Sequence, residues 1–114
     1  MSHTFGNALR EYRRVAGMSQ RELAKKANLD FSYISKMENG RIPPPAADTI
    51  VLICQILGVE PEGLLAITGK IPSEVHADIS SSKAAQEFLR TAKDMKLTDA
   101  EWSEITQSLK DRRG

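Results

Sequence analysis

An all-α fold is predicted by three features of the amino-acid sequence. Apolar residues recur three and four positions apart in successive segments, which is the spacing of one helix face. Glycine and proline residues separate these segments. Ser19 and Thr98 each precede a glutamate by three positions, which is the spacing of a helix-capping box. The breakers divide the chain into a helical domain over residues 1–70 and a helical hairpin over residues 71–114.

Five helices are expected in the first domain. The first covers about residues 4–16, presents Phe5, Leu9 and Tyr12 on one face, and ends at Gly17. The second and third are short and flank residues 28–30. After three prolines, which stiffen the connection, the fourth begins near residue 46 or 48 and ends near residue 57. It is apolar nearly all round, which predicts packing on two sides. A fifth covers residues 61–67.

The second and third helices have the sequence form of a helix-turn-helix, whose second helix enters a DNA major groove. The runs SQRELAKKA and FSYISKMENGR, between residues 19 and 41, closely resemble the Cro/repressor-type regulators of phages and bacteria, the xenobiotic-response-element-like family. The resemblance covers about residues 5–69. It implies a five-helix lambda-repressor-like DNA-binding domain and a sequence-specific transcriptional regulator. No comparably specific match covers the last 40 or so residues.

The same resemblance assigns base reading to three residues of the third helix, Phe31, Ser32 and Lys36. Lys36 would bind guanine O6 or N7, and Phe31 would contact a thymine methyl group. Ser32 can bond either a base edge or a phosphate. An equal alternative for Phe31 is packing inward against Met37 or the second helix.

Phosphate contacts are expected from residues at the edges of the motif. Gln20 lies in the first turn of the second helix, where free backbone N–H groups and the helix dipole favour an anion. In the third helix and the turn after it, the expected phosphate-binding residues are Tyr33, Ser35, Asn39 and Arg41.

From its position in the third helix, Glu38 could be taken for a base-reading residue. A carboxylate that faced the DNA phosphates would, however, be repelled by their negative charge. The resemblance implies instead that Glu38 pairs with an arginine of the first helix, Arg13, and locks the third helix in place.

The charge distribution fits DNA binding better than the net charge of +1 does. Residues 10–41 contain eight basic and four acidic residues, whereas residues 71–114 contain seven basic and eight acidic residues. A basic surface of this kind favours salt-dependent phosphate contacts. A solvated charged face is the alternative explanation.

Residues 71–114 predict a helical hairpin with one apolar seam on each arm. The first arm covers about residues 82–95, and the second begins after Thr98. Self-association is expected, because one recognition helix covers only about four base pairs and a pseudo-palindromic operator needs two copies. The alternative is a hairpin folded back on the fourth and fifth helices. The expected dimerisation residues are Phe88, Leu89, Trp102, Ile105 and Leu109.

Other function classes find little support in the sequence. No nucleophile with a paired base, glycine-rich phosphate loop or metal-ligand spacing is present, so neither catalysis nor a cofactor is expected. His3 and His76 are isolated in segments expected to be loops, and Cys54, the only cysteine, is expected to be a core residue. No signal pattern or membrane-length apolar run is present, which favours the cytoplasm.

The main competing function is that of an antitoxin or immunity-type repressor. Members of the resembled family with this function bind a toxin or a peptidase while also repressing their own promoter. The hairpin would then bind a partner protein as well as, or instead of, a second copy.

Overall fold

The structure, a computed structural model, describes residues 2–114, with side chains from residue 5 onward. The described residues form eight helices and divide into two compact units, one ending at Val75 and the other covering His76–Gly114. None of these helices is both long and apolar enough to cross a membrane. The helices are α1 (Ser2–Val15), α2 (Gln20–Ala27), α3 (Phe31–Glu38), α4 (Ala47–Leu57), α5 (Glu62–Thr68), α6 (Ser73–Ser80), α7 (Lys83–Met95) and α8 (Asp99–Arg113).

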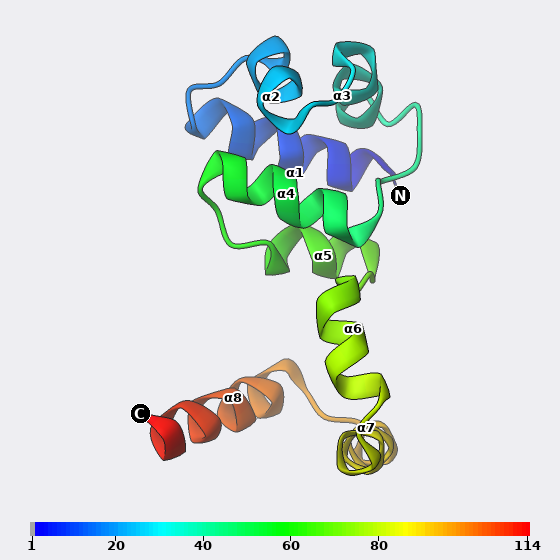
Figure 1. The fold of residues 1–114 in the computed structure, drawn as a ribbon, viewed down its shortest axis with the longest axis vertical. Helices are drawn as coiled ribbons and strands as arrows, with labels where there is room; N and C mark the ends of the chain where they lie inside the picture. Colours follow the sequence, from blue (N-terminus) through cyan, green and yellow to red (C-terminus); the bar gives the residue numbers. More distant parts are fainter. Residues whose placement is uncertain (1) are drawn as a thin grey trace. The chain divides into compact units, whose positions relative to one another are not determined.

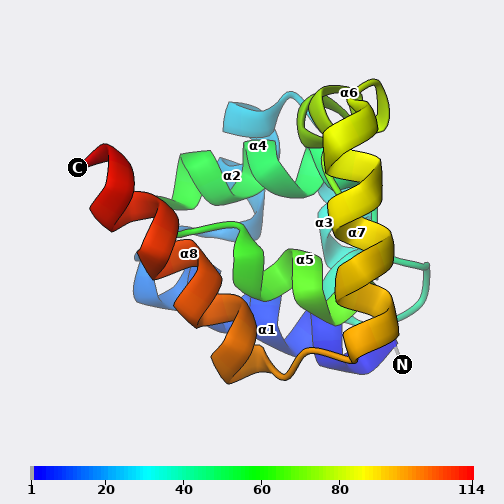
Figure 2. The same cartoon turned by 90° about the horizontal axis from the view of Figure 1, so that it is seen from below.

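In the first unit, five helices enclose one core. The helices α2 and α3 lie on one side of α1 and α4, and α5 lies on the other side (Figure 1). Seen from below, α5 runs between α1 and α4 (Figure 2), and it packs against both. The fully buried large side chains of this core include Phe5, Leu9, Leu23, Ile34, Met37, Ile50, Ile53 and Leu64. The predicted all-α, lambda-repressor-like fold is therefore confirmed.

The helix α4 packs on two sides, as its apolar sequence predicted, with α2 on one side and α5 on the other. Ile50, Ile53 and Cys54 are buried in the core, as expected for a small structural thiol, whereas Leu52 is exposed. The nearly uniform apolar sequence of α4 therefore leaves part of its surface without a protein neighbour in the first unit.

Capping explains why α2 and α3 begin where they do. Ser19 Oγ accepts a hydrogen bond from the Glu22 N–H at 3.0 Å. The Glu22 carboxylate pairs with Lys26 at 3.5 Å, so only half of the expected capping box is formed. Asp30 caps α3 by accepting from the Ser32 N–H at 2.8 Å, and Asn28 ends α2 in the left-handed conformation, with φ of 55°.

Helix α1 approaches the end of α3 closely enough to require a glycine. An added Cβ on Gly6 would lie 2.5 Å from the Glu38 carbonyl oxygen and 2.7 Å from that of Met37. Because these are backbone atoms, they cannot move aside as a flexible side chain could. Gly6 therefore sets the distance between α1 and α3.

The helix α6 was not expected from the sequence, and the expectation that His76 lies in a loop was wrong. His76 lies within α6, and His3 falls within the range of α1. The α6 segment is short, has no buried residue and carries only two large apolar residues, Val75 and Ile79, which is too weak a periodic signal to predict a helix. Its start is held by Asp48, whose carboxylate accepts from the Ser73 N–H at 2.9 Å and the Ser73 hydroxyl at 2.7 Å.

The second unit contains the two predicted C-terminal helices, α7 and α8. Thr98 and Glu101 form a complete capping box at the start of α8, with hydrogen bonds of 2.9 Å and 3.2 Å. Phe88 and Trp102 meet edge to face, with ring centroids 6.2 Å apart. The buried member of the α7 seam is Ala92, and most of the larger apolar side chains of this unit remain exposed.

Candidate nucleic-acid interface

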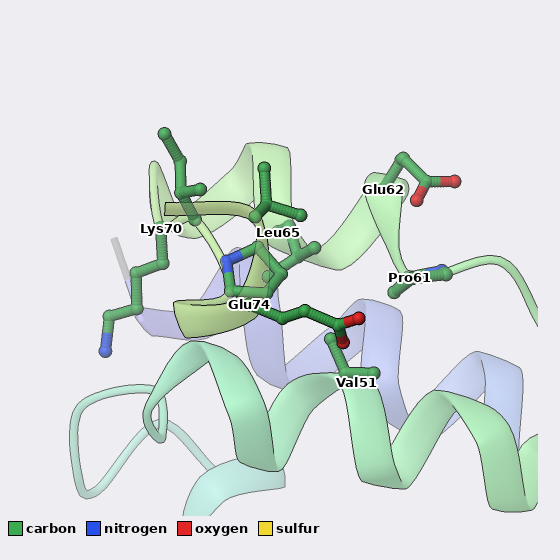
Figure 3. A pocket seen from close by; sticks show the side chains of 9 residues that line it. Val51, Pro61, Glu62, Leu65, Lys70 and Glu74 are labelled. Atoms are coloured by element: carbon green, nitrogen blue, oxygen red, sulfur yellow. The ribbon is translucent and has the colours of Figure 1, made fainter. Parts of the chain in front are cut away.

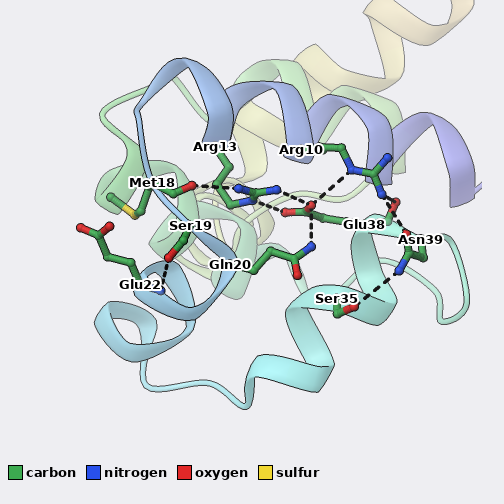
Figure 4. A network of polar contacts seen from close by, with 9 residues as sticks. All are labelled: Arg10, Arg13, Met18, Ser19, Gln20, Glu22, Ser35, Glu38 and Asn39. Atoms are coloured by element: carbon green, nitrogen blue, oxygen red, sulfur yellow. Dashed lines mark hydrogen bonds and ion pairs between the residues drawn. The ribbon is translucent and has the colours of Figure 1, made fainter.

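The carboxylate of Glu38 lies at the centre of the polar network that holds α3 (Figure 4). Its Oε2 accepts from Arg13 Nε at 2.7 Å and its Oε1 from Arg13 Nη2 at 2.9 Å, which is a two-point ion pair. The Glu38 residue is only 1% exposed. The structure thus places the predicted lock residues in direct contact and buries the Glu38 carboxylate inside the first unit.

Two further residues complete this network. Gln20 Nε2 donates to Glu38 Oε1 at 2.9 Å, and Arg10 Nε donates to the same oxygen at 3.4 Å. Arg10 was missed in the sequence, because its position off the apolar face of α1 gave no sign of a partner in α3. The network therefore joins α1, α2 and α3 through one buried carboxylate.

The ionisation of Glu38 reflects two opposing effects. Burial is the largest single effect and raises the pKa of Glu38, but the hydrogen bonds from Arg13, Gln20 and Arg10 and the charge of Arg13 outweigh it. The pKa of Glu38 is therefore lowered. The hydrogen bond to Glu38 also raises the pKa of Arg13, so both partners are held in their charged forms.

The residues predicted to contact phosphate differ in their hydrogen bonds and in their exposure. Gln20 is partly engaged by Glu38, which fixes its amide at the first turn of α2. Asn39 Oδ1 accepts from Arg10 Nη2 at 2.8 Å, and Asn39 Nδ2 donates to Ser35 Oγ at 3.4 Å. Tyr33 and Ser35 are half-buried, whereas Asn39 and Arg41 are exposed.

The residues predicted to read bases all lie on the exposed side of α3. Phe31, Ser32 and Lys36 are exposed, whereas Ile34 and Met37 of the same helix are buried. The Ser32 hydroxyl donates to Asp30 Oδ1 at 2.8 Å, so it is held at the start of the helix. The structure thus brings the three residues together on one surface.

Phe31 packs against α2, which is one of the two contacts in its inward alternative, but its ring stays outside the buried core. The Phe31 side chain is 36% exposed, and the Arg21 guanidinium lies over its ring at 4.2 Å from the centroid. Arg21 of α2 was missed in the sequence, because only the folded turn brings the start of α2 beside the start of α3.

The proline-rich connection after α3 lies beside the part of α3 that carries Ser32 and Lys36. A shallow groove of about 530 Å³ runs between Asp30, Tyr33 and Lys36 on one side and residues 42–46 on the other. Lys70 Nζ fixes this connection by donating to the Pro45 carbonyl at 2.8 Å and the Pro44 carbonyl at 3.2 Å. These contacts fit the rigid spacer that the prolines predicted.

A second groove lies beside α4 and α5 (Figure 3). It measures about 440 Å³, and its lining combines apolar side chains such as Val51 and Leu65 with the charged Glu62 and Glu74. No residue predicted to contact DNA lines it.

The predicted dimerisation residues form an apolar surface on the second unit. Phe88, Leu89, Trp102 and Leu109 are exposed, and Ile105 is half-buried. Phe88 and Trp102 are in contact, so these two exposed side chains form one apolar patch, and exposed apolar patches often mark interaction sites.

Comparison with known proteins places this geometry in a family. Residues 9–64 match the helix-turn-helix family. The chain belongs to the Cro/C1-type helix-turn-helix family. It is 33% identical over 91 residues to the uncharacterized HTH-type transcriptional regulator RghRB of Bacillus subtilis (strain 168). That match covers 77% of this chain and 66% of RghRB. Relatives in this family are DNA-binding transcriptional regulators rather than enzymes.

Two solved structures extend the comparison. The master regulator for biofilm formation SinR, crystallised in complex with DNA, is 31% identical, with a TM-score of 0.51 over 54% of this chain and 97% of that chain. A complex of SinR protein with SinI protein gives a TM-score of 0.52 at 24% identity, over 96% of this chain and 97% of that chain. The second likeness concerns the fold alone.

Proposed function

We propose that this chain is a homodimeric, cytoplasmic transcriptional repressor that binds an inverted-repeat operator through α3 in the major groove. One observation carries the proposal. The buried carboxylate of Glu38 fixes α3 from behind through Arg13, while Ser32 and Lys36 point outward from the opposite side. Residues that read bases need a rigid helix, because a misplaced donor loses its hydrogen bond to the base edge.

The position of α3 in a DNA complex is inferred from the helix-turn-helix fold. SinR, 31% identical to this chain, has been crystallised with DNA. In proteins of this fold, the second helix of the motif lies in the major groove while the first crosses the backbone. In that position, Lys36 on α3 contacts the bases, and Gln20 at the start of α2 contacts a phosphate.

Two copies are needed for adequate sequence recognition. The exposed surface of α3 offers only Phe31, Ser32 and Lys36, which read too few base pairs to define a site in a genome. The apolar surface of the second unit, which includes Phe88, Trp102 and Leu109, supplies a self-complementary interface. A two-fold dimer in turn requires a pseudo-palindromic site.

The experiment is selection of binding sites from a random duplex pool by the full chain. The proposal predicts enrichment of an inverted repeat with half-site centres about 10 base pairs apart or a multiple of that spacing. A reporter promoter that overlaps the selected repeat should lose expression when the chain is present. Enrichment of no sequence would contradict DNA recognition, enrichment of a lone half-site would contradict the dimer, and raised reporter expression would contradict repression.

A second candidate function arises from the same apolar surface. In an antitoxin or immunity-type repressor, the second unit would bind a partner protein such as a toxin or a peptidase. The exposure of Trp102 and Leu109 in the single chain favours this candidate as well as the dimer. Co-expression with the product of an adjacent gene would distinguish them. If the two proteins purify as a complex and Leu109→Glu abolishes that complex, the second candidate function is supported. If the chain forms a homodimer that does not bind this product, the second candidate function is contradicted.

A further inference from the structure

Arg21 and Phe31 form a contact that joins the exposed N-terminal ends of α2 and α3. Arg21 is the second residue of α2, and Phe31 is the first residue of α3. The guanidinium carbon of Arg21 lies 4.2 Å from the centroid of the Phe31 ring. The left-handed turn at Asn28 and the Asp30 cap bring the two helix starts together, so the pair is a product of the motif itself.

The remaining surfaces of the pair face solvent. Phe31 is 36% exposed and lies outside the buried core cluster. Within residues 5–114, the Arg21 guanidinium has no ion pair with a carboxylate and donates no hydrogen bond, and the adjacent Glu22 pairs with Lys26. The N–H edge of Arg21 therefore remains available to a ligand while its flat face rests on the ring.

The contact contributes too little to folding to explain why an aromatic side chain stands there. An exposed cation–π contact stabilises a fold only slightly, and a half-exposed ring loses much of the gain from burial. A stacked guanidinium is nevertheless pre-organised, so it loses less rotamer freedom when its edge donors bind a phosphate or a base. The pair is thus better suited to a ligand than to stabilising the fold.

We propose that Arg21 is a specificity-determining residue that acts together with Phe31. Arg21 orients the ring so that Phe31 contacts the C5-methyl group of a thymine in the major groove. The N–H edge of Arg21 donates to the phosphate beside that thymine. This inference rests on the proposed function, because it requires α3 to enter the major groove.

The test uses the duplex that the full chain selects from a random pool, with each thymine replaced singly by uracil. This replacement removes only the C5-methyl group. The parent should lose about fourfold in affinity at one thymine of each half-site, the effect expected for one buried methyl. Arg21→Ala and Phe31→Ala should bind the thymine and uracil duplexes equally. Arg21→Lys keeps the charge but not the planar stacking, so it should also lose the methyl preference while keeping more of the affinity than Arg21→Ala.

Lys25→Ala is the matched control, because Lys25 is an exposed cation of the same helix. It should retain the thymine preference. Far-ultraviolet circular dichroism of each variant shows whether the helices are intact, as expected for surface substitutions. An equal thymine preference in Arg21→Ala and the parent would overturn the inference but leave the proposed function standing. A parent that selects no sequence at all would overturn both.

Discussion

At the scale of single residues, Glu38 does more than the pairing with Arg13 that the sequence predicted. The same carboxylate also accepts from Gln20 and Arg10. Arg10 continues to Asn39. Residues proposed to hold phosphates are therefore tied to the residue that fixes α3. A change at Glu38 should disturb both the stability of the first unit and the alignment of its DNA contacts.

Glu38→Ala should lower the free energy of unfolding by about 3 kcal/mol or more, because it leaves the guanidinium of Arg13 without its partner. The Arg13 side chain is only 13% exposed, so water cannot fully replace the lost carboxylate. Urea denaturation of the two proteins measures the difference. Glu22→Ala is the control, since its pair with Lys26 is half exposed and should contribute under about 1 kcal/mol. Equal losses in the two variants would contradict the central role of Glu38.

Acid should remove the advantage that the ionised Glu38 provides. The folded pKa of Glu38 lies below its ordinary value of 4.5. The ionised group therefore stabilises the fold at pH above 4.5, and this contribution is lost as pH falls through the folded pKa. The difference in unfolding free energy between the parent and Glu38→Gln should accordingly shrink on acidification. Asp30 and Asp48 also have lowered pKa values. Because the parent and Glu38→Gln both contain these two residues, their titration cancels in the difference. A difference that stays constant from neutral to acid pH would refute the account.

At the scale of elements, the approach of α1 to α3 determines how the recognition helix is seated. Gly6 allows the backbone of α1 to meet the last carbonyl groups of α3. Gly63 of α5 faces a flexible side chain instead of backbone, since an added Cβ there would meet only the Tyr12 hydroxyl at 2.9 Å. The two glycines thus differ in what surrounds them, although both lie in helices.

Gly6→Ala should destabilise the first unit by about 1–2 kcal/mol, because overpacking against two carbonyls outweighs the better helix propensity of alanine. Gly63→Ala should change stability by no more than about 0.5 kcal/mol, since the Tyr12 side chain can shift. Thermal unfolding followed by circular dichroism measures both. If Gly63→Ala proved the more damaging of the two, the assigned contact between α1 and α3 would be wrong.

Local patterns predicted most elements but not the contacts between them. The recurrence of apolar residues three and four positions apart predicted α3, and the Thr98 box predicted the start of α8. The helix α6 was missed, because it has few apolar residues and the carboxylate that holds its start, Asp48, belongs to α4. Arg10 and Arg21 were missed for the second of these reasons. Their partners lie in other helices, and spacing along one helix carries no information about them.

At the scale of the whole molecule, the second unit should make the chain a dimer. Trp102 meets Phe88 edge to face and is 39% exposed, and Leu109 is 58% exposed. Burying this surface between two copies would remove apolar area from water and present two recognition helices to DNA.

Sedimentation should show a dimer for the parent and a monomer for Leu109→Glu, because the new charge would be buried at the interface. Trp102→Ala should weaken the dimer as well. Gln107→Ala, an exposed polar change on the same helix, should leave it intact. Helix content by circular dichroism separates lost association from lost folding, and a parent monomer or a dimeric Leu109→Glu would contradict the proposed interface.

Lys36→Ala tests the central claim most directly, through its affinity for the selected inverted repeat and for a scrambled duplex of equal length. Lys36 lies exposed on α3. If it binds a base, the variant should lose about tenfold or more on the selected duplex and far less on the scrambled one. Lys26→Ala, an exposed change on α2, should weaken both duplexes about equally. The account predicts that the preference for the selected duplex falls only in Lys36→Ala, and an unchanged preference in that variant would contradict it.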